Sequence, residues 1–242
     1  MNIVVFGANG PTGRLLTSQA CSQGHRVTAV TRHSQSFPLR HDNLTVIAGD
    51  VYDEESVHRS VAAHDIVLST LGVPYSRKPI SVYSVGTRNI LRAMRQHGVT
   101  RIACVSSSAT DPDVRDRDSG GGFFFEKVLK PVIGSTFGRT LYADMLRMER
   151  MLRDSEADWT IVRPSGLFET QSVTDYLVDE DFVPARFTSR RDLADVLLRQ
   201  AEDRTFVHKV AAIATVTEQP SVWQLLRNEA LPSGRERATS TV

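Results

Sequence analysis

The feature that most constrains the fold of this chain is the stretch IVVFGANGPTGR at residues 3–14. Its first four residues form an uninterrupted apolar run, which is typical of a strand buried on both faces of a parallel sheet. After the stretch, apolar side chains recur at helical spacing until Gly24, a residue type that commonly ends helices. Between the two, glycines stand at G-x-x-G-x-x-G spacing: Gly7, Gly10 and Gly13. The sequence therefore predicts a strand, a glycine turn and a helix, in that order.

This unit is suited to the pyrophosphate of a dinucleotide. The unpaired N–H groups and the dipole at a helix N-terminus favour negative charge, and a β-carbon at the turn would hold a phosphate away from them. Glycine removes that obstacle. The alternative is a tight turn without a ligand, and the flanking strand and helix favour the binding site over it.

Length and composition predict one domain with small-molecule partners. The chain has 242 residues, of which 40% are hydrophobic, enough for one sizeable core. Its net charge is +1 with both signs interspersed, so neither nucleic acid nor a membrane surface is an expected partner. Cys21 and Cys104 are expected to be buried thiols, as in a reducing compartment. With no signal peptide and no apolar run of about 18 residues, we expect a cytoplasmic protein; its oligomeric state stays open.

Strand and helix patterns alternate along the chain. Strands are expected at 25–32, 44–50, 65–72, 101–109, 158–164 and near 207–214. Helices are expected at about 53–63, 81–97, 141–156 and 189–202. An S-x-x-D capping box of Ser189 and Asp192 is expected to open the last of these helices. The alternation predicts an α/β fold, a doubly wound parallel sheet whose ligand lies beyond the carboxyl ends of the strands.

Two segments are candidates for binding a substrate. The connection near 110–140 is long for a compact domain, which is typical of a functional segment. Its phenylalanines at 123–125 are interpreted either as a lid over an aromatic acceptor or as core. The second segment spans 165–187. Residues 1–228 are expected to form the single domain, and 229–242, almost without apolar side chains, a disordered tail.

Six short motifs together carry a family resemblance: GANGPTGR, AGDV, TLG, VSSSA, DWTIVRP and TSRRDLA. From residue 1 to about 215, the chain resembles the atypical short-chain dehydrogenases, which have a Rossmann-type fold. It is most similar to the NAD(P)H-binding proteins of the NmrA-like and biliverdin reductase B, or flavin reductase, kind. The resemblance is specific for the fold and the dinucleotide, whereas the substrate differs widely on this scaffold.

The resemblance implies which residues meet the ligands. The residues implied to hold the pyrophosphate are Gly7, Asn9, Gly10, Pro11, Thr12 and Gly13. Those implied to line the adenine and ribose are Asp50, Val51, Leu71 and Gly72, and Thr70 is a further cofactor-binding candidate. Residues expected to contact the substrate are Pro164, Leu167 and Phe168.

The end of the second strand indicates which form of the cofactor binds. A site for NAD(H) places a carboxylate there to accept the ribose hydroxyls, whereas the 2′-phosphate of NADP(H) needs a cation. This chain has Arg32 at that position, and Arg14 can supply a second guanidinium to the same phosphate. NADP(H) is therefore favoured over NAD(H). The alternative is that both are solvated surface arginines.

Carbonyl-reducing relatives use a Tyr-x-x-x-Lys pair. Residues four apart share one face of a helix, so the lysine ammonium lies near the tyrosine phenol and lowers its pKa. Here Tyr142 is followed four residues later by Leu146, and Glu149 returns to the same face with the wrong charge. Tyr142 is the candidate proton donor, and its alternative is an aromatic group that packs the helix on the sheet. Ser107 is the second catalytic candidate, by alignment with the family's serine, against ordinary strand-end hydrogen bonding.

These features favour a reductase that transfers hydride from NADPH to a small planar acceptor, such as a flavin, a quinone or a linear tetrapyrrole. Such an acceptor can take its proton from water, so the missing lysine is not required. The alternative is a non-catalytic NADP(H)-binding redox sensor of the NmrA-like kind. An epimerase or dehydratase of nucleotide sugars is disfavoured because that chemistry needs the Tyr/Lys pair. The seven histidines lack metal-ligand spacing, and DPDVRDRD lacks the glycine and glutamate of a calcium loop, so no metal is expected.

Overall fold

The computed structural model describes residues 1–74, 76, 78–111, 113, 139–184 and 186–217. The phenylalanines at 123–125, interpreted as a lid or as core, lie outside these residues, as do most of the 110–140 connection and the expected tail. The strands are β1 Asn2–Phe6, β2 Arg26–Thr31, β3 Leu44–Ala48, β4 Ile66–Ser69, β5 Arg101–Val105, β6 Asp158–Pro164, β7 Gly166–Phe168, β8 Tyr176–Glu180, β9 Phe187–Ser189 and β10 Lys209–Thr215. The helices are α1 Pro11–Ser22, α2 Glu54–Val61, α3 Val82–His97, α6 Arg139–Arg153 and α7 Arg190–Arg199, with single 3₁₀ turns at η1 Ser34–Ser36 and η2 Ser108–Thr110.

Eight strands form one sheet in the order β3-β2-β1-β4-β5-β6-β10-β8. The neighbours pair in parallel as far as β10, and β8 runs antiparallel to β10 at the edge. The predicted Rossmann-type α/β fold is therefore confirmed. Because the strand order reverses between β1 and β4, the switch point of the topology lies at their carboxyl ends, where sheets of this kind bind ligands.

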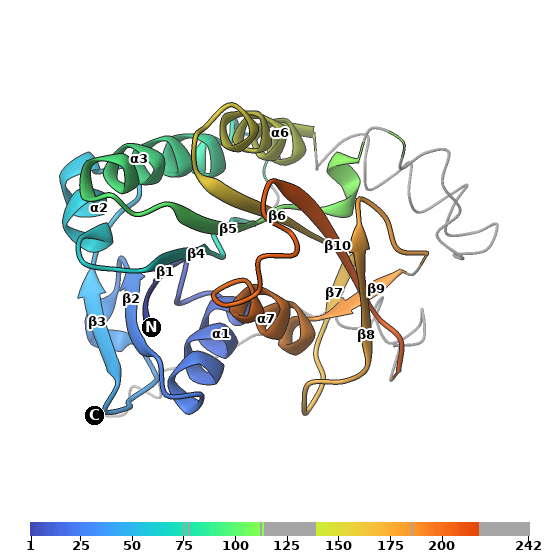
Figure 1. Ribbon diagram of the computed structural model, residues 1–242, viewed down its shortest axis with the longest axis horizontal. Helices are drawn as coiled ribbons and strands as arrows, with labels where there is room; N and C mark the ends of the chain where they lie inside the picture. Colours follow the sequence, from blue (N-terminus) through green and yellow to red (C-terminus); the bar gives the residue numbers. More distant parts are fainter. Residues whose placement is uncertain (75, 77, 112, 114–138, 185, 218–242) are drawn as a thin grey trace, which may run out of the picture.

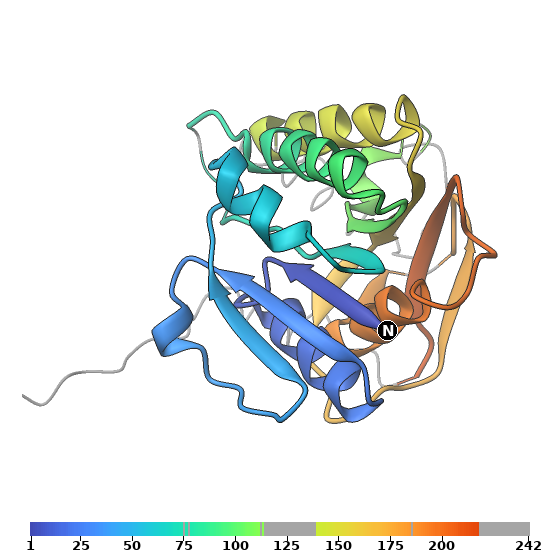
Figure 2. The ribbon, with the colours of Figure 1, turned by 60° about the vertical axis from the view of Figure 1, so that its left-hand side comes forward.

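Helices cover both faces of the sheet. Helices α2, α3 and α6 lie on one face, and α1 and α7 lie side by side on the other (Figure 1). Figure 2 shows the sheet between the two helical layers. Along β1, Val4 and Phe6 pack into the core under α3 and α6, whereas Ile3 and Val5 pack into the core under α1 and α7. Burial on both faces explains the uninterrupted apolar run in the sequence.

The predicted carboxyl ends of three strands were wrong. We expected β3, β4 and β5 to extend to residues 50, 72 and 109, and they end at Ala48, Ser69 and Val105. Beyond these points polar side chains form hydrogen bonds with nearby backbone groups. These backbone groups therefore do not pair with a neighbouring strand. Asp50, for example, accepts from the N–H of Tyr52 at 3.0 Å. The motif residues at these strand ends consequently lie in turns, from which their groups can face a ligand.

The segment 165–187, interpreted from sequence only as a substrate segment, contains regular structure. β7 pairs in parallel with β9 in a separate two-stranded sheet, and β8 extends the large sheet. The capping box predicted for Ser189 and Asp192, at the start of α7, is half formed. Ser189 accepts from the N–H of Asp192 as predicted, but the Asp192 carboxylate accepts from the N–H and hydroxyl of Thr174 and from the hydroxyl of Thr215. The buried Asp192 side chain therefore ties α7 to Thr174, which precedes β8, and to Thr215 at the end of β10.

Helix α3 is capped from a distant part of the chain. Its N-cap residue, Ser81, makes no side-chain cap. The buried carboxylate of Asp144, on α6, accepts instead from the N–H of Tyr83 at 2.9 Å and from the N–H of Ser84 at 3.3 Å. The carboxylate thus supplies an acceptor for the orphan N–H donors of the first turn of α3, and it fixes α6 beside that helix.

Candidate functional site

The turn after β1 requires glycine at its first position. Gly7 has φ +75°, a left-handed conformation that side chains rarely adopt, and a β-carbon there would lie 2.5 Å from the carbonyl oxygen of Thr70. The hydroxyl of Thr70 in turn donates to the carbonyl oxygens of Phe6 and Gly7. The turn after β1 and the end of β4 therefore contact each other directly through Gly7 and Thr70.

The other two glycines of the turn differ in what surrounds them. Gly13 lies within the first turn of α1, and a β-carbon there would meet the backbone of Gly7 and Ala8, so this glycine permits close packing. A β-carbon on Gly10 would meet only the Gly7 carbonyl, at 3.4 Å, which is ordinary contact. The fold itself therefore does not need glycine at position 10. A glycine there leaves space beside the N-terminus of α1, which suits a ligand that approaches the backbone.

The N-terminus of α1 offers unused donors. Gly10 is its N-cap residue and supplies no side-chain cap, and its first turn contains no acidic residue. The N–H groups of Thr12 and Gly13 have no partner among the described residues. In α2, by contrast, the side chain of Asp53 accepts from the first turn. Free N–H groups at the positive end of a helix, with open space beside them, fit a bound pyrophosphate.

The two arginines predicted to contact a 2′-phosphate both lie at the carboxyl ends of the strands. Arg14 is exposed and donates from Nε to Asn9 Oδ1 at 3.0 Å, so the predicted pyrophosphate residue Asn9 holds its guanidinium at the turn. Arg32 directly follows β2, is exposed, and makes no hydrogen bond or ion pair to another described residue. Because β2 pairs with β1, Arg32 lies beside the glycine turn. Pro11, the first residue of α1, is exposed on the same edge.

Two of the residues implied for adenine and ribose, Val51 and Leu71, meet at Gly86 of α3. A β-carbon on Gly86 would lie 2.9 Å from Leu71 Cδ1 and 3.2 Å from Val51 Cβ, so both side chains pack at this glycine. Val51 is further held by its carbonyl oxygen, which accepts from Asn89 Nδ2 at 2.9 Å. Asp50 precedes it in an Asx turn, and Gly72 is exposed after Leu71. This arrangement brings the ends of β3 and β4 to one place, and their contact with a nucleotide stays a prediction.

The end of β5 differs from the strand end expected for the serines. Ser107 lies outside the strand, as the N-cap residue of η2, and its Oγ accepts from the N–H of Ala109 at 3.2 Å. All three serines at 106–108 lie beyond the strand, which was expected to extend to residue 109, because β5 ends at Val105. Ser106 is buried and donates from Oγ to Glu149 Oε1 at 2.6 Å. The structure thus gives Ser107 a local capping role, and its catalytic role stays a prediction.

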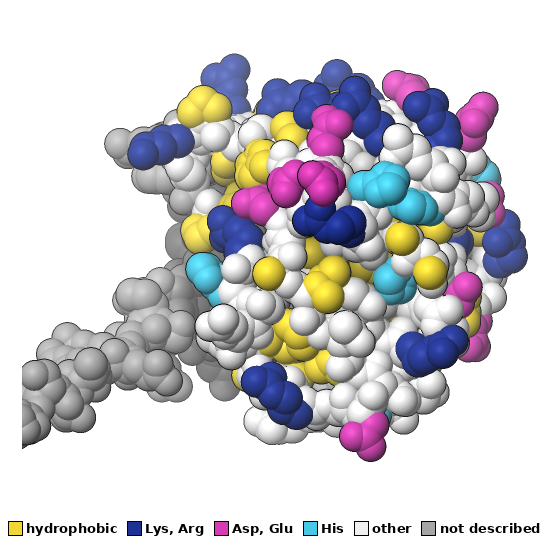
Figure 3. Space-filling model, turned by 90° about the vertical axis from the view of Figure 1, so that its left-hand side faces the viewer, with side chains coloured by type: hydrophobic (Ala, Val, Ile, Leu, Met, Phe, Trp, Pro, Cys, Tyr) yellow, Lys and Arg dark blue, Asp and Glu magenta, His cyan; other side chains and the backbone are white. Residues whose placement is uncertain are grey.

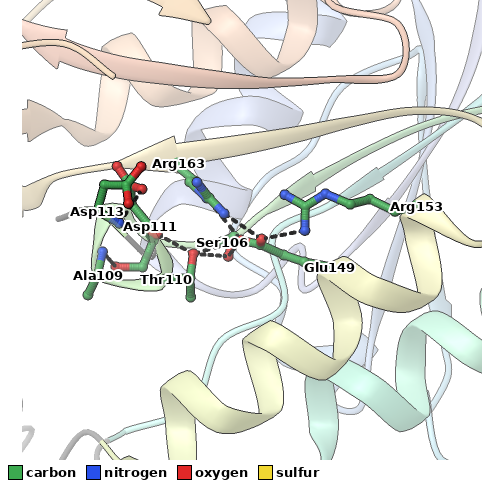
Figure 4. Close-up of polar contacts among 9 residues, drawn as sticks. Ser106, Ala109, Thr110, Asp111, Asp113, Glu149, Arg153 and Arg163 are labelled. Atoms are coloured by element: carbon green, nitrogen blue, oxygen red, sulfur yellow. Dashed lines mark hydrogen bonds and ion pairs between the residues drawn. The ribbon is translucent and has the colours of Figure 1, made fainter. Parts of the chain in front are cut away.

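A buried ionic network centred on Glu149 lies next to the segment that follows β5 (Figure 4). Glu149, whose side chain is fully buried, accepts from Arg163 Nε at 3.1 Å and from Arg163 Nη2 at 2.6 Å. The hydroxyls of Ser106 and Thr110 donate to Oε1, and Arg153 donates to Oε2 at 3.2 Å. Burial by itself raises the pKa of the Glu149 carboxyl, but the hydrogen bonds and charge of Arg163, with the two hydroxyls, outweigh it and lower the pKa below its ordinary value. Glu149 is therefore ionised, and α6, β5, η2 and β6 are joined at one point.

This network corrects the argument about Tyr142. From sequence, Glu149 was interpreted as a carboxylate that would raise the pKa of the phenol, but its charge is paired with Arg163 inside the fold. Tyr142 lies in the first turns of α6, half-buried against the core under that helix, with Leu146 four residues later. Its packing role is thus visible in the structure, and a role as proton donor stays a prediction.

The expected substrate residues lie at the end of β6 and on β7. Pro164 is buried at the last position of β6, and Leu167 is half-buried against the core under α1 and α7. The ring of Phe168 meets that of Phe187 edge to face, with centroids 6.5 Å apart. Phe168 thus packs β7 on β9, and contact with a substrate stays a prediction for all three.

Sequence reasoning missed Arg163 and Arg190. Arg163 is the single charged side chain in the interior of an otherwise apolar strand, β6, and a buried cation requires a partner, so its position was a usable signal. Arg190, the first residue of α7, donates from Nη1 to Thr12 Oγ1 at 3.4 Å. No local pattern marks that contact, since the two residues lie 178 positions apart.

The comparison with protein families agrees with this geometry. Residues 7–204 match the family described as NAD(P)H-binding. The chain is also 37% identical, over 108 residues, to an uncharacterized protein of Mycobacterium tuberculosis, a match that covers 44% of this chain and 12% of that protein. The chain thus spans only a small part of the curated relatives that it matches first.

Solved structures with the same fold cover nearly the whole chain. An oxidoreductase from Lactococcus lactis has a TM-score of 0.74 at 15% identity, covering 94% of this chain and 95% of its own. A short-chain dehydrogenase/reductase from Veillonella parvula, in complex with NADP, has a TM-score of 0.72 at 17% identity, covering 91% and 98%. At these identities the likeness shows the fold.

The surface, the helices and the cysteines add three observations. On the face shown in Figure 3, basic and acidic side chains are intermingled. Among the described helices, none has the length and apolar content needed to cross a membrane. The two cysteines are buried and free, and they lie on opposite faces of the sheet, as part of the two separate core clusters.

Proposed function

This chain belongs to the NAD(P)H-binding family, and from that premise we propose that it is an oxidoreductase that transfers hydride from NADPH to a small planar acceptor of the flavin, quinone or linear tetrapyrrole class. The N-terminus of α1 carries the proposal. It offers the N–H groups of Thr12 and Gly13 without a side-chain cap, with space beside Gly10. In a doubly wound sheet, a helix N-terminus after β1 is where the pyrophosphate of a dinucleotide binds.

NADPH is proposed over NADH on the basis of charge. Arg32 is exposed at the end of β2 without a partner among the described residues, and no carboxylate occupies that position. Arg14 reaches the same edge from the turn, held by Asn9. A 2′-phosphate pairs well with guanidinium groups, whereas the two ribose hydroxyls of NADH would gain little from them.

The acceptor class is supported by the state of the polar groups near the end of β5. Ser106 and Thr110 both donate to Glu149, so neither hydroxyl proton is free for a substrate. Tyr142 lacks a cation four residues later that would tune its pKa. An oxidised flavin or quinone draws its proton from water, so the protein needs chiefly to hold it against the nicotinamide.

In this proposal the residues of the chain bind and orient, and the nicotinamide supplies the hydride when it is bound. The donors of Thr12 and Gly13 hold the pyrophosphate, and Val51 and Leu71 place the adenosine end. The Glu149 network keeps the end of β5 rigid where the nicotinamide end is expected. A fixed geometry of this kind contributes to catalysis by positioning.

The test is consumption of NADPH, followed by its absorbance, with a panel of flavins, quinones and linear tetrapyrroles. Gly10→Val is the matched control, because the fold tolerates a β-carbon at this position while a phosphate would not. We expect turnover with at least one acceptor by the wild type, none by the variant, and the same melting temperature for both. A wild-type protein that binds NADPH but reduces no acceptor would contradict the proposal.

One observation favours a second candidate function, a non-catalytic sensor of NADP(H). The side chains near the end of β5 that could take part in a reaction already form structural hydrogen bonds. Ser107 caps η2, and Ser106 donates to Glu149. A sensor should bind NADP⁺ and NADPH with different affinities and turn over neither. Calorimetric titration of both forms, beside the acceptor panel, separates the two functions.

A further inference from the structure

Helices α1 and α7 begin at the same edge of the sheet, and a cation joins their first turns. The two helices lie side by side on one face (Figure 1). Arg190 is the first residue of α7, after its N-cap Ser189. Its Nη1 donates to the hydroxyl oxygen of Thr12, in the first turn of α1, at 3.4 Å. A guanidinium that is 178 positions away in the sequence therefore reaches the N-terminus of α1.

The second partner of Arg190 fixes the direction of its side chain. Its Nε pairs with Glu169 Oε1 at 2.8 Å, at the end of β7. The Glu169 side chain is 65% exposed, whereas that of Arg190 is 26% exposed. A guanidinium has five N–H donors, and these two contacts use only part of them. Arg190 is thus held in place by one contact on each side, with donors left for an anion.

The contact also settles what the hydroxyl of Thr12 can do. Its oxygen accepts from Arg190, so its own proton is free to donate elsewhere. The N–H of the same residue has no partner among the described residues. An anion that accepts from the N–H or hydroxyl of Thr12 therefore lies within reach of the Arg190 guanidinium as well.

We propose that Arg190 is a binding residue for the pyrophosphate of the dinucleotide, which it contacts together with the N-terminus of α1. It completes a site whose other donors are backbone N–H groups, and a guanidinium can pair with two phosphate oxygens at once. This inference rests on the cofactor of the proposed function but not on turnover. Because the pyrophosphate is common to NADPH and NADH, Arg190 contributes to the affinity of both, in contrast to Arg32.

Arg191 provides a matched control. It is the next residue of α7, is half-buried like Arg190, and donates from Nε to the carbonyl oxygen of Thr170 at 3.0 Å. Both arginines therefore tie α7 to the segment after β7, but only Arg190 also contacts Thr12. Replacing each with Ala separates loss of a tether from loss of a phosphate ligand.

The experiment is calorimetric titration of NADPH, NADH and adenosine 2′-monophosphate into the wild type and the variants Arg190→Ala, Arg191→Ala and Glu169→Gln. We expect Arg190→Ala to weaken NADPH and NADH by the same factor, about ten- to hundredfold, as for a lost charge-assisted hydrogen bond. Its binding of adenosine 2′-monophosphate, which lacks a pyrophosphate, should not change. Arg191→Ala should bind all three as the wild type does. Glu169→Gln should bind both dinucleotides at least as tightly, since a competing carboxylate is removed.

Four results would overturn the assignment. Equal losses in Arg190→Ala and Arg191→Ala would show that Arg190 acts only as a tether of α7. Weaker binding by Glu169→Gln would show that the ion pair itself, and not the free guanidinium, supports the site. A loss confined to NADPH would place Arg190 at the 2′-phosphate. A wild-type protein that bound neither dinucleotide would overturn the proposed cofactor as well, whereas the other three results would leave it standing.

Discussion

Replacing Glu149 with Gln tests whether the buried network at the end of β5 depends on a charge. The substitution keeps the shape of the side chain and one carbonyl oxygen, which can still accept from Ser106 and Thr110. The new amide nitrogen is a donor, and it replaces Oε2, which accepts from Arg163 Nη2 at 2.6 Å and from Arg153 Nη1 at 3.2 Å. Two guanidinium groups would then face a donor where each now has an acceptor.

The expected cost follows from the burial of Arg163. Its side chain is 5% exposed, so the guanidinium cannot turn to water when its partner loses the charge. Removing one member of a buried ion pair typically costs about 3–5 kcal/mol of the free energy of unfolding, because a charge stays buried without compensation. We expect a loss of that size in Glu149→Gln. Arg153→Gln is the matched control: its side chain is 40% exposed, so the loss should be below about 1 kcal/mol.

The assay is equilibrium unfolding in urea, followed by circular dichroism and tryptophan fluorescence, with a double variant that removes both charges. Glu149→Gln with Arg163→Met should lose clearly less than the sum of the two single losses, because no unpaired charge is left inside. The slopes of the transitions should agree among variants for the comparison to hold. A loss below about 1 kcal/mol in Glu149→Gln, or additive losses in the double variant, would refute the reasoning that the ion pair of Glu149 and Arg163 stabilises the fold.

Three further predictions concern charge, chemistry and pH. Arg32→Glu should weaken NADPH by about 2–3 kcal/mol and NADH much less, measured by titration; equal losses would rule out a 2′-phosphate contact. Tyr142→Phe should change kcat less than about tenfold and Ser107→Ala should cost more, in steady-state NADPH oxidation; a thousandfold loss in Tyr142→Phe beside a near-normal Ser107→Ala would restore a tyrosine acid. Because the pKa of Glu149 is lower in the folded than in the unfolded protein, its contribution to stability is present above about pH 4.5 and is lost as the pH falls through the folded pKa. Urea midpoints should therefore fall less steeply with acid in Glu149→Gln than in the wild type, and parallel curves would count against this assignment.

Much of the candidate site could be predicted from sequence because its signals are local. The apolar run at 3–6, the glycine spacing and the helix after it are read from neighbouring residues, and the structure places them as β1, the turn and α1. Thr70 and Gly7 are in contact because each directly follows one of two neighbouring parallel strands, which end on the same side of the sheet. The roles of these residues toward a ligand remain predictions, since sequence and fold provide a fitting place for the pyrophosphate without showing it bound.

Strand ends and the regular structure of the 165–187 segment could not be predicted in the same way. Ser107 and Asp50 belong to segments with apolar, strand-like patterns, and only the actual hydrogen bonds of their side chains to nearby backbone decide that the ladder stops before them. The pairing of β7 with β9 joins residues about twenty positions apart, through segments of only three residues. Such short strands carry too little periodicity to be recognised without their partner.

By itself, the sequence determined the alternation of the main strands and helices, the doubly wound fold class and the place of the glycine turn, because backbone preference and hydrophobic period depend on residues close together. Tertiary structure decided what the charged side chains do. Glu149 reads as an ordinary helical carboxylate until Arg163 of β6 is placed against it, and Asp144 becomes the cap of α3 only when α6 lies beside that helix. Arg190 reaches Thr12 only because α7 begins where α1 begins. The free energy of a charge depends on its burial and partners, and these are set by parts of the chain far apart in sequence.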